Sequence, residues 1–499
     1  MEPTAAVTRR TAVKRLGALA MAAGTLELVG PLGFTPIRAY AATAPSDIQF
    51  DIGAFLTTPP QTSDTGVQFQ MPPVHTIFLT ATLKRTPTVG DQTEMNRVLA
   101  ALEAAYPWGA THLVTFVAYG LPYFSRLTGG LTGSLVSSHM PRLTSNTSRY
   151  VLEEAVPGPT DVSSVNPGIT KLRYNVPVAI EHNDLLITLR SDNSQFLSEV
   201  IAWFGGNNSL RGQAVASPAW SSLLTFTSSR SMFAQIGLPQ SVALSNGLPF
   251  ANYIQHQSPM WMGFADQQTN GSGPAAICTF AGNSSAHLTT AAAGDYFDNG
   301  SVQHLSHDIL DMLQFFDMDT ATSTPGSDGV FTERVQYMFH SPQIDPGYGN
   351  QFIDGGGPAF LQNQNNGPAY AARTAQGIGT SFDPTTGQNE HRMGHLSCLQ
   401  RSSRATDGTP IHIRNDGPGF DNMDVPDGSN QPKLQFMVFV PSAEFFRTMR
   451  VNQASLDLQN QFAVPPNDNG LERFITATRR QNFLTPPRRH RSFPLVELA

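Results

Sequence analysis

Two rhythms of apolar and polar residues alternate along the amino-terminal half of the chain. Residues 74–83 and 112–120 are short runs rich in β-branched and aromatic residues, which predicts buried strands. Between them, apolar residues recur at steps of three and four over residues 93–106, the spacing of one helix face. A further apolar run at 185–189 predicts a strand, and residues 193–204 predict a helix. The expected order is therefore strand, helix, strand, strand, helix.

A similar but more interrupted pattern of apolar and polar residues occurs in the carboxyl-terminal half. The apolar positions of residues 301–316 follow a helical spacing, which predicts a helix there. Residues 434–440 form a clear strand pattern, and Pro-Ser-Ala-Glu at 441–444 is typical of a helix start. The intervals 204–258 and 317–390 are rich in Gly, Asn, Ser, Gln and Pro, so we expect ordered loops that wall a site.

Two such halves predict an α+β protein of two ferredoxin-like units, each an antiparallel sheet with helices on one face. We expect the units to pack as a dimeric α+β barrel with long loop insertions. The amino-terminal unit is expected over residues 42–250 and the carboxyl-terminal unit over 251–499, which ends in a basic tail. No repeat of about 20–50 residues is visible, which argues against a solenoid or a propeller.

Residues 1–41 have the features of a twin-arginine signal peptide. Arg9 and Arg10 precede a mildly apolar stretch at 16–29, and Ala39-Tyr40-Ala41 offers a cleavage site. We therefore expect export by the twin-arginine route and a periplasmic or extracellular location. No later segment reaches the roughly 18 apolar residues of a transmembrane helix, so no membrane span is expected.

Composition narrows the range of partners. Only 14% of the 499 residues are charged, and 42 Gly with 37 Pro indicate long ordered loops. The formal net charge of -7 gives no electrostatic reason to bind nucleic acid. Cys278 and Cys398 are too few for a disulfide framework and lack the paired spacing of a zinc site. Two separate buried thiols are the favoured interpretation, with a single bridge as the alternative.

Histidine and arginine concentrate between His391 and Asp421. His391 and His395 lie in a polar segment, and Arg414 follows His395 nineteen positions later in the tripeptide His-Ile-Arg. The turn-forming sequence 416–420 comes directly after it. Because the chain has 13 histidines, such a cluster alone identifies no site.

The spacing resembles that of the dye-decolourising haem peroxidases, which bind the iron through a histidine in a polar segment and deliver a distal arginine from a later strand. Gly263-Phe264-Ala265-Asp266 is similar to the family's Gly-x-x-Asp-Gly motif, with Gln267 in place of the final glycine. Residues 295–306 are similar to the family's entry into a helix beside the haem. The resemblance covers most of residues 75–460 and is specific at these three motifs.

This resemblance implies one haem b per chain, with His395 as the axial iron ligand and His391 as its rival. Asp266 and Arg414 would cleave the O–O bond of hydrogen peroxide, and Asp457 would accept the hydrogen of the proximal imidazole. Hydrogen peroxide and a phenolic or dye-like electron donor are then the substrates, and homo-oligomerisation stays open. Two alternatives remain: a haem-binding, transport or iron-release protein without efficient turnover, and a haem-free secreted binding protein.

Other conspicuous residues are interpreted as structural. His304, His307, Asp308 and Asp311 are expected on the solvated face of the predicted helix. The arginines at 479–480 and 488–491 are expected in a tail that packs on the protein or contacts another subunit.

Overall fold

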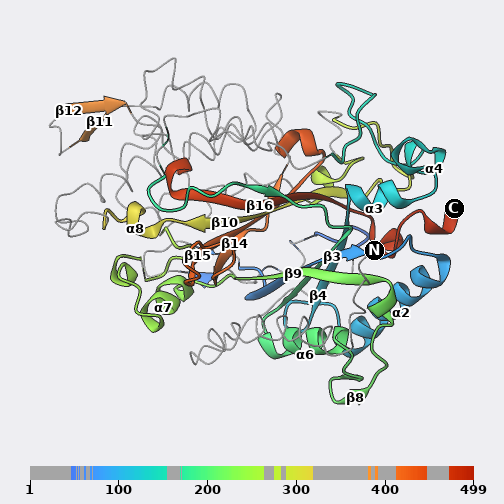
Figure 1. The fold of residues 1–499 in the computed structure, drawn as a ribbon, viewed down its shortest axis with the longest axis horizontal. Coiled ribbons are helices and arrows are strands. Elements are labelled where there is room, and N and C mark those ends of the chain that lie inside the picture. The colour runs from blue at the N-terminus through green and yellow to red at the C-terminus, as the bar shows by residue number, and fades with distance from the viewer. Residues whose placement is uncertain are drawn as a thin grey trace, which may run out of the picture.

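One ten-stranded sheet organises the part of the chain that the structure describes (Figure 1). The computed structural model describes residues 46–51, 53, 56, 61–62, 68–69, 71–153, 169, 171–254, 256–262, 275–282, 288–318, 380–383, 388–391, 412–446 and 471–499. The strand order is β13-β15-β10-β16-β4-β6-β3-β9, with β14 also paired to β15 and β5 to β16. Every pairing in it is antiparallel except that of β5 with β16.

The amino-terminal half contributes four neighbouring strands in the order β4-β6-β3-β9. Their bounds are His75–Leu83 for β3, Val114–Gly120 for β4, Leu185–Ser191 for β6 and Leu224–Phe233 for β9. Helix α2 (Val89–Ala105) connects β3 to β4, and α6 (Ser194–Phe204) lies between β6 and β9. This is the connectivity of a ferredoxin-like unit, and it confirms the predicted order of the first five elements.

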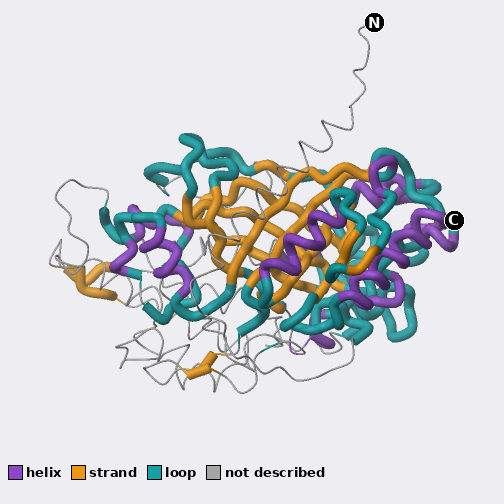
Figure 2. Tube along the Cα trace, turned by 90° about the horizontal axis from the view of Figure 1, so that it is seen from below, coloured by secondary structure: helices purple, strands orange, loops and turns teal. Residues whose placement is uncertain are grey.

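Helix α2 illustrates how the local sequence forms these elements. The Thr88 side chain accepts a hydrogen bond from the backbone N–H of Asp91, and the Asp91 carboxylate accepts one from the backbone N–H of Thr88, which makes a capping box. The buried stripe of the helix then packs on the apolar residues of β3, such as Ile77 and Leu79. Figure 2 shows helices crossing the strands on this side of the sheet.

The carboxyl-terminal half repeats the same strand order. Strands β13 and β14 both pair with β15, which is followed in the sheet by β10 and β16. Its strands are β10 (Ser301–Leu310), β13 (Ile413–Arg414), β14 (Gly417–Asp421), β15 (Gln431–Val440) and β16 (Ile475–Thr485). The predicted strand at 434–440 is confirmed within β15, and residues 443–446 are helical as expected.

The helix predicted at 301–316 is wrong. Residues 301–310 form β10, the central strand between β15 and β16, and only α8 (Met312–Phe315) is helical. Every residue of β10 is buried, so its apolar residues need not alternate with polar ones. The apolar residues Val302, Leu305 and Ile309 fall at steps of three and four, which also fit one helix face, and pairing on both sides decides for the strand.

Two further predictions were incomplete. The interval 204–258, expected to be loop, contains β9 and α7 (Leu238–Ser245), and the carboxyl-terminal tail contains β16. The remaining short elements are β1 (Gln61–Thr62), β2 (Gln68–Phe69), α3 (Leu121–Arg126), α4 (Ser134–Ser137), β5 (Ala179–Ile180), β7 (Ser209–Leu210), β8 (Gln213–Ala214), β11 (Thr380–Asp383) and β12 (Gln388–His391).

The sheet curls until its two ends meet. Strand β14 lies against β9, where a Cβ added at Gly419 would be 2.8 Å from the carbonyl oxygen of Ser231. At Gly417 the corresponding distance to the carbonyl oxygen of Phe233 would be 3.1 Å. Glycine is therefore needed on β14 for this close approach of two backbones. The chain is an α+β protein with antiparallel sheet pairing, as the sequence predicted, and the two expected sheets are joined into one through β16 and β4.

The inner face of the curled sheet is filled from both halves. Its apolar cluster includes residues of β3, β4, β15 and β16: Phe78, Phe116, Met437, Phe439 and Phe483. The other face of the amino-terminal half packs on α2 and α6, and the other face of the carboxyl-terminal half packs on residues 443–446. We call this last surface, on the side of Val302, Val438 and Leu484, the outer face of the carboxyl-terminal half.

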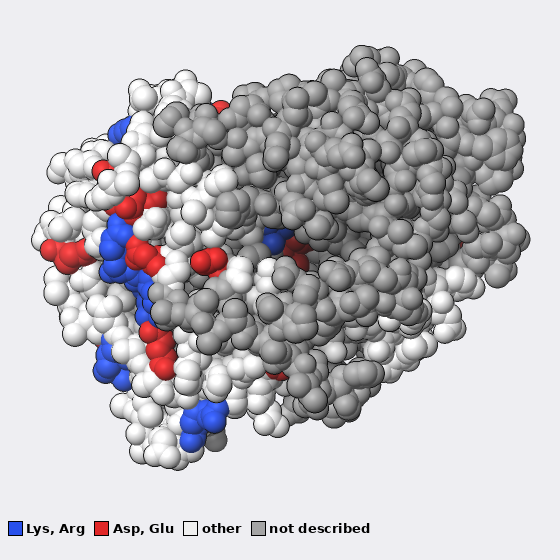
Figure 3. Space-filling model, turned by 180° about the vertical axis from the view of Figure 1, so that it is seen from behind, with Lys and Arg blue, Asp and Glu red and all other residues white. Residues whose placement is uncertain are grey.

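The arginines at 488–491 pack against the protein. This is one of the two arrangements expected from the sequence, the other being contact with another subunit. Arg488 and Arg491 both pair with Glu103 on α2, and Arg489 pairs with Asp47 and Asp298. Figure 3 shows basic and acidic side chains interspersed on the described part of the back face. Among the described residues, no helix has the length and apolar character of a membrane-spanning segment.

Candidate functional site

Arg414 is the one predicted site residue whose side chain lies in the described part of the chain. It is half-buried on β13, where it pairs with Val438 of β15. Val438 pairs in turn with His304 of β10, and His304 pairs with Asn482 of β16. Directly opposed residues project from the same side of a sheet. Arg414 and His304 therefore belong to one row on the outer face of the carboxyl-terminal half.

His304 is buried within this row and not on a solvated helix face, so that prediction is wrong. Its Nδ1 lies 2.7 Å from the Asn482 Oδ1, and its Nε2 lies 2.6 Å from the Ser306 hydroxyl. Because an amide oxygen only accepts, Nδ1 donates its hydrogen to Asn482. The ring also stacks on Phe446 with centroids 3.4 Å apart. Both ring nitrogens of His304 are therefore engaged by neighbouring side chains.

The surroundings of the row are apolar. Val302, Val438 and Val440 come from the sheet, and Phe446 with Ala443 comes from the segment that follows β15. A guanidinium beside aliphatic and aromatic side chains is a donor set that suits a flat apolar ligand with negative charge at an edge or an axial position. No group of three or more His, Cys, Asp or Glu side chains that could hold a metal ion occurs among the described residues.

Asn415 points to the opposite face from Arg414. Its side-chain Oδ1 accepts a hydrogen bond from Nη1 of Arg190, a fully buried residue of β6 in the amino-terminal half. Its backbone N–H donates to the Met437 carbonyl oxygen at 2.8 Å. The residue after Arg414 is thus held in the interior of the curled sheet.

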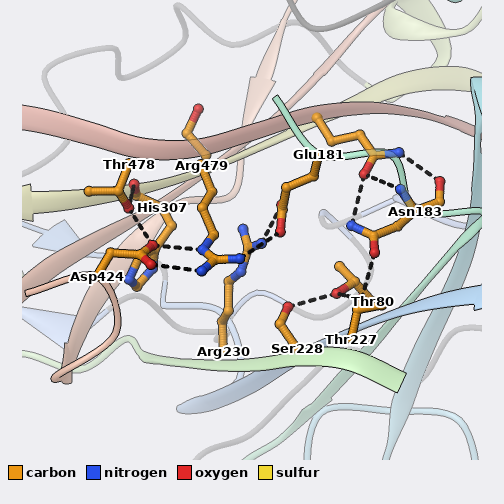
Figure 4. Close-up of polar contacts among 12 residues, drawn as sticks. Thr80, Glu181, Asn183, Thr227, Ser228, Arg230, His307, Asp424, Thr478 and Arg479 are labelled. Carbon is orange, nitrogen blue, oxygen red and sulfur yellow. Dashed lines mark hydrogen bonds and ion pairs between the residues drawn. The ribbon is translucent and has the colours of Figure 1, made fainter. Parts of the chain in front are cut away.

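A second polar cluster lies where the two halves meet (Figure 4). Glu181 accepts from Arg230 of β9 and lies 3.5 Å from Nη1 of Arg479 on β16. Arg479 binds the Asp424 carboxylate through two hydrogen bonds of 2.6 and 2.7 Å, and Thr478 adds a third of 2.9 Å. Burial raises the pKa of Asp424, but the hydrogen bonds and charge of Arg479, together with the hydrogen bond from Thr478, lower it and hold the pKa at about 2.

The cluster continues along β10 and β15. His307 is buried, with Nδ1 2.9 Å from the Gln435 Nε2 and Nε2 3.5 Å from the Asp421 carboxylate. The buried Lys433 lies 3.6 Å from that carboxylate and donates to the Met423 carbonyl oxygen at 2.6 Å. Burial lowers the pKa of Lys433, while Asp421 opposes this change. The expected solvated position of His307 is therefore also wrong.

Sequence reasoning missed Arg230, Glu181 and Asp424 because they come from separate segments. No local spacing joins residues 181, 230, 424 and 479, and only the curled sheet brings them together. Arg479 had been noticed, but as part of a basic tail.

The other predicted site residues lie outside the described part of the chain. Asp266, His395 and Asp457 are not described. For His391 only the position of its backbone, at the end of β12, is described. Their roles stay predictions. Cys278 is buried and carries no disulfide, while Cys398 lies outside the described residues.

Comparison with known proteins gives a family and a set of distant structural likenesses. No curated protein matches the chain. A putative DyP-type peroxidase from Shewanella oneidensis shares 13% identity, with 85% of this chain and 94% of that chain covered, at a TM-score of 0.44. A DyP-type peroxidase from Cellulomonas bogoriensis shares 10% identity, with 90% and 95% covered, at a TM-score of 0.46.

The encapsulated DyP-type peroxidase from Mycobacterium smegmatis shares 15% identity, with 87% of this chain and 98% of that chain covered, at a TM-score of 0.42. At these identities and TM-scores, the likenesses assign no activity. Residues 158–487, about two thirds of the sequence, match a family of unknown function (DUF7405), and the chain belongs to that family.

Proposed function

We propose that this chain is a haem b-dependent peroxidase that reduces hydrogen peroxide and oxidises phenolic or dye-like electron donors. The observation that carries the proposal is the position of Arg414. It projects from β13 onto the outer face of the carboxyl-terminal half, directly opposite Val438 of β15. The same arginine takes the distal role in the sequence motifs.

The described residues fit one side of such a site. Arg414 offers a permanent positive charge with several N–H donors, and the opposed Val438 adds an apolar surface beside it. His304 is an unsuitable iron ligand because both of its ring nitrogens are hydrogen-bonded. The ligand is proposed to be His395, with His391 as its rival and Asp457 as acceptor of the imidazole hydrogen.

The bound haem would supply the iron that exchanges electrons with peroxide and donor. Arg414 then stabilises the negative charge that develops on the oxygen atoms during O–O cleavage. The Asp266 carboxylate accepts a proton from one peroxide oxygen and returns it to the other. We further propose that residues 1–41 direct export by the twin-arginine route, and that residues 42–250 and 251–499 are the two units.

An absorption spectrum tests cofactor binding. Wild-type protein supplied with haem is expected to show a Soret band and a positive pyridine haemochrome assay, and His395→Ala is expected to lose both. Retention in His395→Ala with loss in His391→Ala would assign the ligand to the rival histidine. A wild-type protein without a Soret band would overturn the proposal in favour of a haem-free binding protein.

The reaction with peroxide tests turnover. Arg414→Ala is expected to bind haem yet react with peroxide about 100- to 1,000-fold more slowly, the usual cost of removing a group that stabilises developing charge. Asp266→Ala is expected to slow the same step, whereas Arg97→Ala on the surface of α2 serves as the matched control. Full haem loading with background turnover in the wild type would instead support the haem-carrier alternative, which Gln267 in place of the motif glycine keeps open.

A further inference from the structure

Arg414 lies next to a short break in the pairing of its strand with β15. Strand β13 consists of Ile413 and Arg414, which pair with Phe439 and Val438 of β15. Strand β14 continues the same register from Gly417, and residues 415 and 416 lie between the two paired segments. Successive side chains of a strand point to opposite faces, so the residue after Arg414 faces the interior.

Asn415, in this break, connects the strand to the amino-terminal half. It is 4% exposed, its N–H donates to the Met437 carbonyl oxygen, and its side-chain oxygen accepts from Arg190. Arg190 is itself fixed in the middle of the amino-terminal half, because it is 0% exposed and pairs with Thr76 on one side and Val114 on the other. Asn415 can reach Arg190 only from the interior, and Arg414 must then point outward.

We infer that Arg190 and Asn415 are positioning residues for Arg414, so that the amino-terminal half sets the geometry of the site on the carboxyl-terminal half. The inference rests on the proposed function. Neither residue touches the reacting atoms, because both lie on the inner face of the sheet. Their effect passes through the backbone of β13, whose register and twist decide where the guanidinium of Arg414 lies.

A buried hydrogen bond between the halves could also contribute stability alone, and the chain contains a matched example. Asn183 of the amino-terminal half donates from Nδ2 to the Gln481 Oε1 at 2.9 Å, and Gln481 donates back to the Asn183 carbonyl oxygen at 2.7 Å. Both residues are buried, and the pair joins the halves as Arg190 and Asn415 do. Gln481 lies on β16, away from Arg414.

The test compares Asn415→Ala with Asn183→Ala in haem-loaded protein. Asn415→Ala is expected to slow the reaction with peroxide by about ten- to a hundredfold, the scale expected from a small misplacement of a catalytic group. Its affinity for cyanide, an equilibrium measure that needs no turnover, is expected to fall as well. Asn183→Ala is expected to lower the urea midpoint similarly while leaving the rate and the cyanide affinity unchanged.

Three further variants separate positioning from a general loss of structure. Asn415→Asp keeps an oxygen acceptor for Arg190 and is expected to restore the rate. In an Arg414→Ala background, Asn415→Ala is expected to cause no further loss. Arg190→Lys provides a second route if Asn415→Ala does not fold, and it is expected to slow the same step. In the protein without haem, Asn415→Ala is expected to raise hydrogen exchange of the amides of 413–415.

Several results would overturn the positioning role. Equal rates in Asn415→Ala and Asn183→Ala would do so, as would rate losses in Asn415→Ala and Arg414→Ala that combine additively. Failure of the proposed function gives a different pattern, since the parent protein would then lack a Soret band or Arg414→Ala would be without effect. Unchanged hydrogen exchange in Asn415→Ala would contradict the inference even without haem.

Discussion

His304 and Arg414 lie in one row of the outer face of the carboxyl-terminal half, joined through Val438, which pairs with both. The two residues have different parts in this row. Arg414 carries a permanent charge, whereas both ring nitrogens of His304 are engaged by Asn482 and Ser306. The row therefore combines the side chain that we propose to act on peroxide with one held by structural hydrogen bonds.

Replacing His304 by Phe is expected to destabilise the protein by about 1–3 kcal/mol. The aromatic ring could still stack on Phe446, but polar atoms of Asn482 and Ser306 would stay buried without their partner. Urea unfolding measures the change. The half-buried His112 is the control, and His112→Phe is expected within about 0.5 kcal/mol of the wild type. A His304→Phe protein as stable as that control would contradict the structural role.

Replacing Glu181 by Gln is expected to be much more costly, about 3–5 kcal/mol. Arg230 is 1% exposed and would remain buried without its carboxylate partner. The matched control is Glu94→Gln, because Glu94 pairs with the half-exposed Arg97 and such pairs contribute less than about 1 kcal/mol. Similar urea midpoints for the two variants would show that the Glu181 pair is not effectively desolvated.

Asp424 is expected to make stability depend on acid. Its pKa is about 2 in the folded protein, below the ordinary value of 3.8, so its contribution is complete above about pH 4 and is lost as the pH falls toward 2. The contribution is about 2 kcal/mol at most, because the side chain is partly exposed. Asp424→Asn should flatten urea stability between about pH 4 and pH 2 relative to the wild type.

Arg479→Gln provides the second arm of that experiment. It removes the guanidinium that holds the pKa of Asp424 low, so it is expected to weaken the same acid dependence while keeping the carboxylate. A wild-type acid dependence that survives in both variants would place its origin in other carboxylates, such as Asp91, whose pKa is also about 2 because of Arg85.

Replacing Gly419 by Ala is expected to cost about 1–3 kcal/mol. The new methyl group would lie 2.8 Å from the Ser231 carbonyl oxygen, so β14 and β9 would have to separate. Gly109→Ala is the control, because nothing lies within 4 Å of a Cβ at that position. Thermal unfolding of the two variants distinguishes a local strain at the closure of the sheet from a general effect of losing glycine.

The amino-terminal elements could be predicted from the sequence because their signals are local. The capping box of α2 and its apolar stripe lie within one segment, and the strands at 74–83 and 185–189 have short apolar runs bounded by polar residues. The choice of Arg414 as a candidate site residue also came from a local motif. Its face on the sheet did not, because that depends on Val438 and Asn415 with their distant partners.

Tertiary structure alone decided the secondary structure of residues 301–310 and the pairing of the charged side chains around Glu181. The apolar positions of this segment also fit a helical spacing, so only pairing with β15 and β16 makes β10 a strand and buries His304 and His307. Glu181, Arg230 and Arg479 meet because the curled sheet brings three remote segments together. The sequence by itself determined which residues can carry charge and which segments can pair, and the closure of the sheet determined which of them meet.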